Sequence, residues 1–113
     1  MSYRREDQSI ELREQMGGGS GAAQLTALVR EIPKNLRLYS LIRLAPGSSI
    51  GYHVHENETE LFHFISGSGM ADDNGVKVAV SAGDTLSTTS GFGHSVENTG
   101  GEDLVFLAAI VRD

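Results

Sequence analysis

The stretch that decides the fold runs from Gly47 to Gly67 and reads GSSIGYHVHENETELFHFISG. It holds three of the four histidines in the chain, together with three glutamates. Side chains alternate between faces along a strand, so His53 and His55 are expected to share one face. Glu60 opens the next extended run, with apolar residues at every second position after it. The spacing predicts two neighbouring strands that direct imidazole and carboxylate groups to one place.

The composition limits the classes of partner and chemistry. The chain has 113 residues, enough for one domain, and 39% of them are hydrophobic. Its 9 Lys and Arg residues against 15 Asp and Glu residues give a net charge of −6, which argues against nucleic acid or an anionic membrane as a partner. Cysteine is absent, which excludes disulfides, thiolate zinc sites and iron–sulfur clusters.

The N-terminal part of the sequence differs from the rest. Residues 1–16 are charged and weakly patterned, and they lead into the glycine-rich run 17–21. We expect a flexible N-terminal arm with a glycine hinge over residues 1–21 and a β-barrel domain over residues 22–113. The segment before the glycine run is expected either to be frayed or to form a strand or short helix that docks on a neighbouring subunit. The N-terminus has no apolar signal-peptide core, and no apolar stretch approaches the length of a membrane span, so we expect a cytoplasmic protein.

The remainder of the chain is patterned as short strands punctuated by turns. Asn74-Gly75 between two extended runs is a strong hairpin signal, and no clean helical period follows Gly21. This pattern predicts an all-β sandwich or barrel. The expected strands cover residues 36–44, 50–55, 60–66, 69–72, 76–80, 85–88, 94–97 and 104–111.

The candidate metal ligands are three histidines and one glutamate. His53 and His55 come from one strand and Glu60 from the next, and His94 follows a Gly-Phe-Gly turn far along the chain. A nitrogen-rich set with one carboxylate suits a first-row divalent metal ion. The pair H-x-H alone is a weak signal, and the stretch lacks the second histidine of a zinc-protease helix.

The longer spacing around these residues is more specific. Gly47, His53, His55, Glu60 and Gly67 are separated by five, one, four and six residues. This spacing resembles the first signature motif of the cupin family at every position.

A second motif lies closer to the C-terminus. Gly83, Thr89, Gly91, His94 and Asn98 are separated by five, one, two and three residues, which resembles the second cupin motif. The family usually has proline where Thr89 stands, and this departure removes no ligand.

The resemblance implies a double-stranded β-helix, the jelly-roll barrel of cupins, that binds one divalent transition metal ion. Its implied ligands are His53, His55, Glu60 and His94. Manganese, iron or nickel in six-coordination would leave two positions open, whereas zinc could be saturated by the four side chains. The identity of the metal stays open between these four elements.

Two functions are compatible with such a centre. The first is a metal-dependent enzyme of the dioxygenase, isomerase, epimerase or decarboxylase type, acting on a small polar or carbonyl-bearing molecule, with Glu60 as the catalytic base. The alternative is a non-catalytic metal-containing barrel that binds or senses a small molecule. Arg37 and Arg43 could meet an acidic substrate, although ordinary surface roles are expected. The resemblance to small cupins also implies a homodimer, in which the N-terminal arm could be exchanged between the two subunits.

Other polar residues of the two motifs are expected to have structural or solvent-exposed roles. Glu56 and Glu58 are expected in a solvated loop, with lining of the site entrance as the alternative. The opposite parity of His63 should direct it away from the metal. Asn98 should pin a turn rather than contact a substrate.

Overall fold

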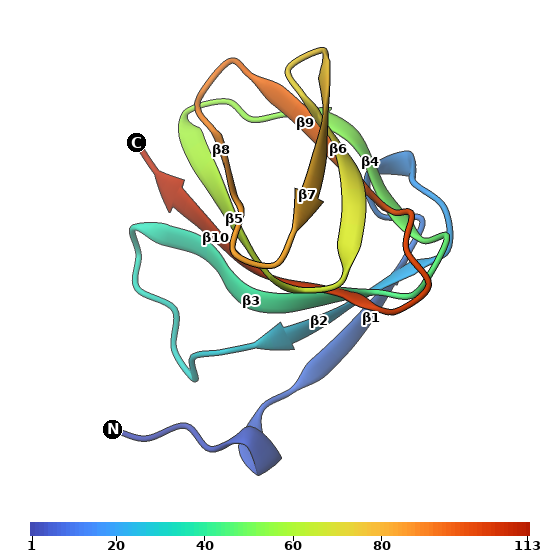
Figure 1. Ribbon diagram of the computed structural model, residues 1–113. Helices are drawn as coiled ribbons and strands as arrows, with labels where there is room; N and C mark the ends of the chain where they lie inside the picture. The colour runs from blue at the N-terminus through green and yellow to red at the C-terminus, as the bar shows by residue number, and fades with distance from the viewer.

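Ten antiparallel strands form two sheets in the computed structural model, which describes residues 1–113 (Figure 1). The six-stranded sheet has, in spatial order, β1 (Ile10–Glu14), β2 (Ala22–Ala27), β3 (Leu36–Leu44), β10 (Leu104–Arg112), β5 (Glu58–Ser66) and β8 (Thr85–Thr88). The four-stranded sheet has β4 (Ser49–Val54), β9 (Gly93–Asn98), β6 (Ser68–Asp73) and β7 (Val76–Ser81). The helical elements are two short 3-10 turns, η1 (Arg5–Asp7) and η2 (Met16–Gly18), and neither could cross a membrane.

The predicted all-β fold is confirmed, and each segment predicted as a strand is one. The predicted bounds of β3 and β8 agree with the structure at both ends, and the others differ by one or two residues. Two further strands have no counterpart among the predicted ranges. β2 reads AAQLTA, in which small residues give little β-propensity, and β1 lies in the charged N-terminal segment, where a strand was one alternative without defined bounds.

The core lies where the two sheets curl toward each other. Phe62 and Phe64 from β5 meet Phe106 from β10, with ring centroids 4.7 Å and 5.2 Å from the Phe106 centroid. All three rings are at most 2% exposed. This apolar floor lies directly beneath Glu60, because residues 60, 62 and 64 share one face of β5.

The predicted hairpin connects β6 and β7. Asn74 and Gly75 both have positive φ angles, 49° and 95°, as a two-residue turn between twisted strands requires. Asp73 pairs with Val76 across the turn, and the carboxylate of Asp72 accepts a hydrogen bond from the N–H of Gly75.

The N-terminal segment is packed against the rest of the same chain. β1 pairs with β2, and η2 lies on β4. The approach of the two backbones requires glycine, because a Cβ on Gly51 would overlap the carbonyl oxygen of Gly17, and a Cβ on Gly19 would overlap that of Ser49. The glycine run thus has a packing role here, while the division of the chain at residue 21 and the flexibility of the arm stay predictions.

The loop after β8 contains Thr89, which stands where the second motif usually has proline. The carbonyl of Thr89 accepts a hydrogen bond from the N–H of Phe92, whereas its own N–H donates none to the backbone, and its side chain is exposed. We therefore expect Thr89→Pro to fold normally and to raise the free energy of unfolding by up to about 1 kcal/mol, because proline restricts the unfolded chain. Thermal or urea denaturation would measure this, and a clear loss of stability would contradict it.

Candidate metal centre

A bulge in β4 directs its first histidine into the barrel. Ile50 pairs with Val96 and His53 with His94, so two residues of β4 lie opposite one residue of β9 between these pairs. Without the extra residue, strict alternation from the buried Ile50 would point His53 outward. Gly51 lies within this bulge and gives η2 the space it needs above β4.

The second histidine lies one residue beyond β4 and is fixed through its backbone. The N–H of His55 donates to the carbonyl of Phe92, and the carbonyl of His55 accepts from the N–H of Gly91, at 3.0 Å and 2.7 Å. The loop after β8 thereby holds His55 in place. Its side chain is 3% exposed.

The four predicted ligands converge on one point. A carboxylate oxygen of Glu60 lies 2.9 Å from Nε2 of His55, 3.0 Å from Nε2 of His94 and 3.8 Å from Nε2 of His53. The four ligand atoms all lie within 4.8 Å of one another, so the cluster could hold a metal ion. His53 is the most accessible member, with 32% of its side chain exposed.

Each imidazole is oriented by a hydrogen bond at its other nitrogen. Nδ1 of His53 donates to the carbonyl of Gly51 at 2.8 Å, and Nδ1 of His55 donates to the carboxylate of Glu58 at 3.2 Å. Nδ1 of His94 is hydrogen-bonded to the hydroxyl of Thr88 at 2.8 Å, in line with the usual support of metal-binding histidines.

These contacts determine the tautomers and explain why the cluster fits a cation. A carbonyl and a carboxylate accept only, so His53 and His55 carry their hydrogen on Nδ1 and direct the Nε2 lone pair inward. Nε2 of His94 lies 3.1 Å from Nε2 of His53 and 3.2 Å from that of His55. The Nε2 lone pairs of His53 and His55 face the carboxylate of Glu60, and a divalent metal ion bound between these groups would remove their mutual repulsion.

The charges in the cluster also favour a cation. Burial raises the pKa of Glu60, but the hydrogen bonds and positive charge that the surrounding histidines supply once they are protonated outweigh it and lower the pKa to about 2. The Glu60 carboxylate raises the pKa of His53 despite partial burial of that imidazole. Glu60 is therefore ionised at neutral pH and supplies a fixed negative charge.

The structure corrects the expectation for Glu58 and leaves that for Glu56 intact. Glu58 lies at the start of β5 rather than in a solvated loop, and its side chain is only 13% exposed. Arg37 donates two hydrogen bonds to its carboxylate, at 2.7 Å and 2.9 Å, and these lower the pKa of Glu58. Glu58 therefore links Arg37 to His55, while Glu56 is exposed as expected.

Loss of the Glu58 carboxylate should weaken metal binding although Glu58 is not among the four converging side chains. We expect Glu58→Ala to lower the affinity for a divalent metal ion by about 10- to 100-fold, because His55 loses the acceptor that fixes its tautomer. Glu56→Ala, a change of the same type two residues away, should leave the affinity unchanged. Isothermal titration calorimetry of both variants measures the difference, and equal affinities would contradict the role given to Glu58.

Two further expectations are confirmed. His63 is exposed and hydrogen-bonds through Nδ1 to the hydroxyl of Thr85, away from the cluster. Asn98 pins a turn: its amide donates to the carbonyls of Leu44 and Glu102, and its amide oxygen accepts from the N–H of Gly100.

A pocket of about 220 Å³ opens onto the cluster. Two arginines border it: Arg37 from β3, held by Glu58, and Arg13 from β1, which sequence reasoning missed because β1 was not among the predicted strand ranges. Arg43, by contrast, pairs with Asp103 on the surface. The remaining lining is Met16, Gly17, Leu38 and Ile110, together with His53, His55 and Glu60.

The barrel and its cluster of three histidines and a glutamate define the class. The cupin domain family model matches residues 40–110, and the chain belongs to the cupin family. The resemblance inferred from the two motifs is thereby confirmed, and so is the double-stranded β-helix it implied.

Individual relatives have narrower descriptions. The chain is 43% identical over 98 residues to a Thermotoga maritima protein named oxalate-binding protein. The matched stretch covers 85% of this chain and 81% of the relative. It superposes with a TM-score of 0.94 and 39% identity, over 100% of both chains, on a Thermotoga maritima structure described as a predicted oxalate decarboxylase. A Cupin 2 conserved barrel domain protein from Salinispora arenicola gives a TM-score of 0.70 at 22% identity, over 98% of this chain and 87% of the other, which supports the fold alone.

Proposed function

We propose that this protein binds one divalent transition metal ion through His53, His55, Glu60 and His94 and uses it to bind a small organic acid anion, with oxalate as the model ligand. The observation that carries the proposal is the convergence of three inward-facing Nε2 atoms and one ionised carboxylate at the base of a pocket. A metal ion bound there would supply a Lewis-acidic centre for oxygen ligands.

The ligand set narrows the metal but does not select one element. Three imidazoles and one carboxylate suit manganese, iron or nickel in six-coordination, which would leave two positions for a chelating ligand. Zinc in tetrahedral coordination would be saturated by the same four side chains. The proposal therefore favours an ion that accepts six ligands.

The surroundings of the cluster support an anionic ligand. Arg13 and Arg37 are the charged side chains at the pocket wall besides the cluster itself, and guanidinium groups recognise carboxylates. The names of the two Thermotoga maritima relatives both refer to oxalate. A flat dicarboxylate could bind the ion at one edge and face the arginines at the other.

Binding without turnover is the function that the pocket supports best. Arginine stays protonated and stabilises an anion rather than transferring a proton. Glu58, the nearest further carboxylate, is occupied by Arg37 and His55. Glu60 could act as a catalytic base only by giving up its place among the ligands.

Decarboxylation is the second candidate, favoured by the description of the Thermotoga maritima structure. In that reaction oxalate loses carbon dioxide and takes up one proton to give formate. The isomerase type has weaker support, because the Acidithiobacillus ferrooxidans structure described as a putative sugar phosphate isomerase is 26% identical to this chain.

One experiment separates these functions. The full chain is loaded with manganese, iron, nickel or zinc in turn, oxalate binding is measured by calorimetry, and formate is assayed after incubation. Saturable binding without formate supports the binding function, and formate production in proportion to protein supports the enzyme. Failure of every metal-loaded form to bind oxalate would refute the proposal.

We also propose a homodimer to which the N-terminal segment contributes. β1 is an edge strand whose residues are all exposed, and Ile10 and Leu12 on one face are 63% and 64% exposed. We expect the dimer to weaken on deletion of residues 1–16 and in the double variant I10K/L12K, because both remove this apolar face. Light scattering would measure it, and a monomeric full-length protein at micromolar concentration would contradict it.

A further inference from the structure

We propose that the ligand of this site is an organic anion with an apolar tail, whose oxygen-bearing head binds at the metal and whose tail enters an adjoining hollow. The inference rests on the proposed function and specifies the class of ligand beyond oxalate. The hollow, called here the tail compartment, has a volume of about 300 Å³.

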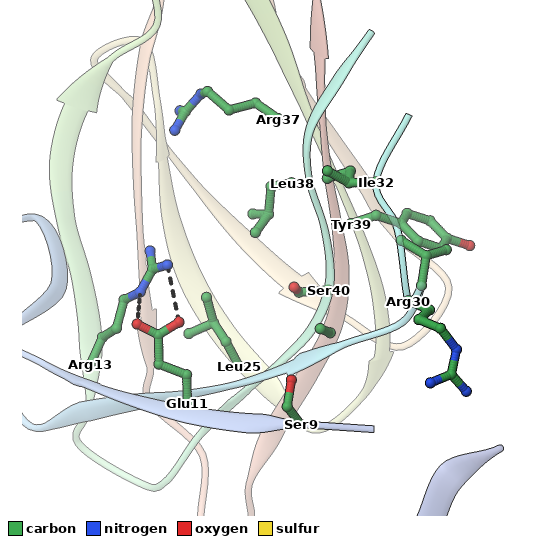
Figure 2. A pocket seen from close by; sticks show the side chains of 12 residues that line it. Ser9, Glu11, Arg13, Leu25, Arg30, Ile32, Arg37, Leu38, Tyr39 and Ser40 are labelled. Atoms are coloured by element: carbon green, nitrogen blue, oxygen red, sulfur yellow. Dashed lines mark hydrogen bonds and ion pairs between the residues drawn. The ribbon is translucent and has the colours of Figure 1, made fainter. Parts of the chain in front are cut away.

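The tail compartment lies between the β1–β2 hairpin and β3, and it adjoins the metal pocket. Arg13, Arg37 and Leu38 line both spaces. Figure 2 shows the two arginines on one side of the compartment, Leu25 and Leu38 at its centre, and Tyr39 and Ile32 on the far side. A ligand longer than oxalate could therefore extend from the metal past Leu38.

The lining of the compartment suits an apolar group. Half of its twelve lining residues are hydrophobic: Leu25, Ala27, Val29, Ile32, Leu38 and Tyr39. The other six are polar or charged: Ser9, Glu11, Arg13, Arg30, Arg37 and Ser40. A site that combines hydrophobic side chains with polar groups can hold a small molecule that has both an apolar and a charged part.

The two arginines between the spaces differ in how firmly they are held. Arg13 pairs with Glu11 on its own strand, and the two side chains are 44% and 61% exposed (Figure 2). Such exposed pairs contribute little, so Arg13 can exchange Glu11 for a ligand carboxylate. Arg37 is fixed by two hydrogen bonds to Glu58. The anionic head of the ligand would thus lie near one guanidinium group that is held in place, Arg37, and one that can move, Arg13.

The volumes leave room for a ligand larger than oxalate. The metal pocket measures about 220 Å³, and the tail compartment beside it measures about 300 Å³. Oxalate would occupy the metal pocket and leave the tail compartment to solvent. A 2-oxo or 2-hydroxy acid with an aromatic or branched aliphatic side chain would occupy both spaces.

The test compares acids with the same head and different tails. Calorimetry on the metal-loaded full chain is carried out with oxalate, pyruvate and phenylpyruvate. We expect phenylpyruvate to bind at least about tenfold more tightly than pyruvate, because only its tail reaches the apolar lining. Equal affinities for the two oxo acids would overturn the inference, including the case in which a second copy of the chain covers the compartment.

Substitutions in β2 test whether the tail compartment causes the tighter binding of phenylpyruvate. Ala27→Phe fills the compartment and should abolish the advantage of phenylpyruvate without changing the affinity for pyruvate or for the metal. Thr26→Phe, on the opposite face of β2, should keep the advantage. Should Ala27→Phe fail to fold, Ile32→Asp serves instead, since this residue is 46% exposed and its change places a negative charge against the tail. An advantage that survives filling of the compartment would overturn the assignment.

The controls separate this inference from the proposed function. Binding of oxalate and pyruvate without any advantage for phenylpyruvate would leave the proposed function intact and refute the tail compartment. Absence of binding by all three acids to every metal-loaded form would refute both.

Discussion

Replacing His94 by alanine is expected to reduce the affinity for a divalent metal ion by more than about 100-fold. This loss exceeds the roughly 10- to 100-fold effect of removing a residue that only hydrogen-bonds to a metal ligand. His94 is 1% exposed, stacks on Phe62 with ring centroids 4.8 Å apart, and is hydrogen-bonded to Thr88. Because this imidazole is buried and held by both contacts, its removal takes away a ligand atom that is already in position. Metal content after dialysis against a competing chelator would measure the loss, and His53→Ala and His55→Ala should behave alike.

The matched control is the remaining histidine. His63→Ala removes an exposed imidazole that contacts Thr85 and should leave metal affinity unchanged. Glu60→Gln keeps the shape of the side chain but removes the negative charge, so weaker binding with an intact barrel is expected. Metal loss in His63→Ala together with full occupancy in His94→Ala would show that the cluster is not the metal site.

Metal occupancy is expected to fall steeply as the pH drops from about 7 to about 5, with the ordinary imidazole pKa near 6.5. Histidine binds metal only when neutral, so protons compete with the ion at each imidazole. Each histidine contributes up to about a tenfold loss of affinity per pH unit below its pKa. The pKa of His53 is raised by Glu60, so competition at this residue begins at a higher pH.

The carboxylate should not contribute to this loss. The pKa of Glu60 is lowered to about 2, so Glu60 stays ionised throughout the titrated range. Calorimetric affinities at several pH values would give the slope, and the His63→Ala variant should follow the same curve. An affinity independent of pH over this range would contradict binding through three imidazoles.

Patterns among neighbouring residues were sufficient to predict most strands of the barrel and the four candidate metal ligands. Alternation around His53 and His55, the turn at Asn74-Gly75 and the long apolar run of β10 each depend on neighbours in the sequence. The alternation of side chains along the strand also predicted that His63 lies outside the cluster, and its contact with Thr85 confirms this. Such patterns are sufficient where a strand has one buried and one exposed face.

The features that sequence reasoning missed depend on contacts between distant segments. The bulge at Gly51 is visible only in the pairing of β4 with β9. Glu58 was assigned to solvent because nothing in the sequence shows that Arg37, on another strand, pairs with it. Arg13 reaches the pocket because β1 joins the sheet through the small residues of β2, which carry little β-propensity.

The position of β10 between β3 and β5 has a consequence for biosynthesis. Every other strand precedes Leu104–Arg112 in the chain, so a ribosome-bound intermediate already contains all four ligands while β3 and β5 still have unpaired edges. Such edges pair readily with those of other chains. The barrel therefore closes only after β10 has left the ribosomal exit tunnel, and a messenger truncated before Leu104 would produce an aggregation-prone polypeptide rather than a smaller working barrel.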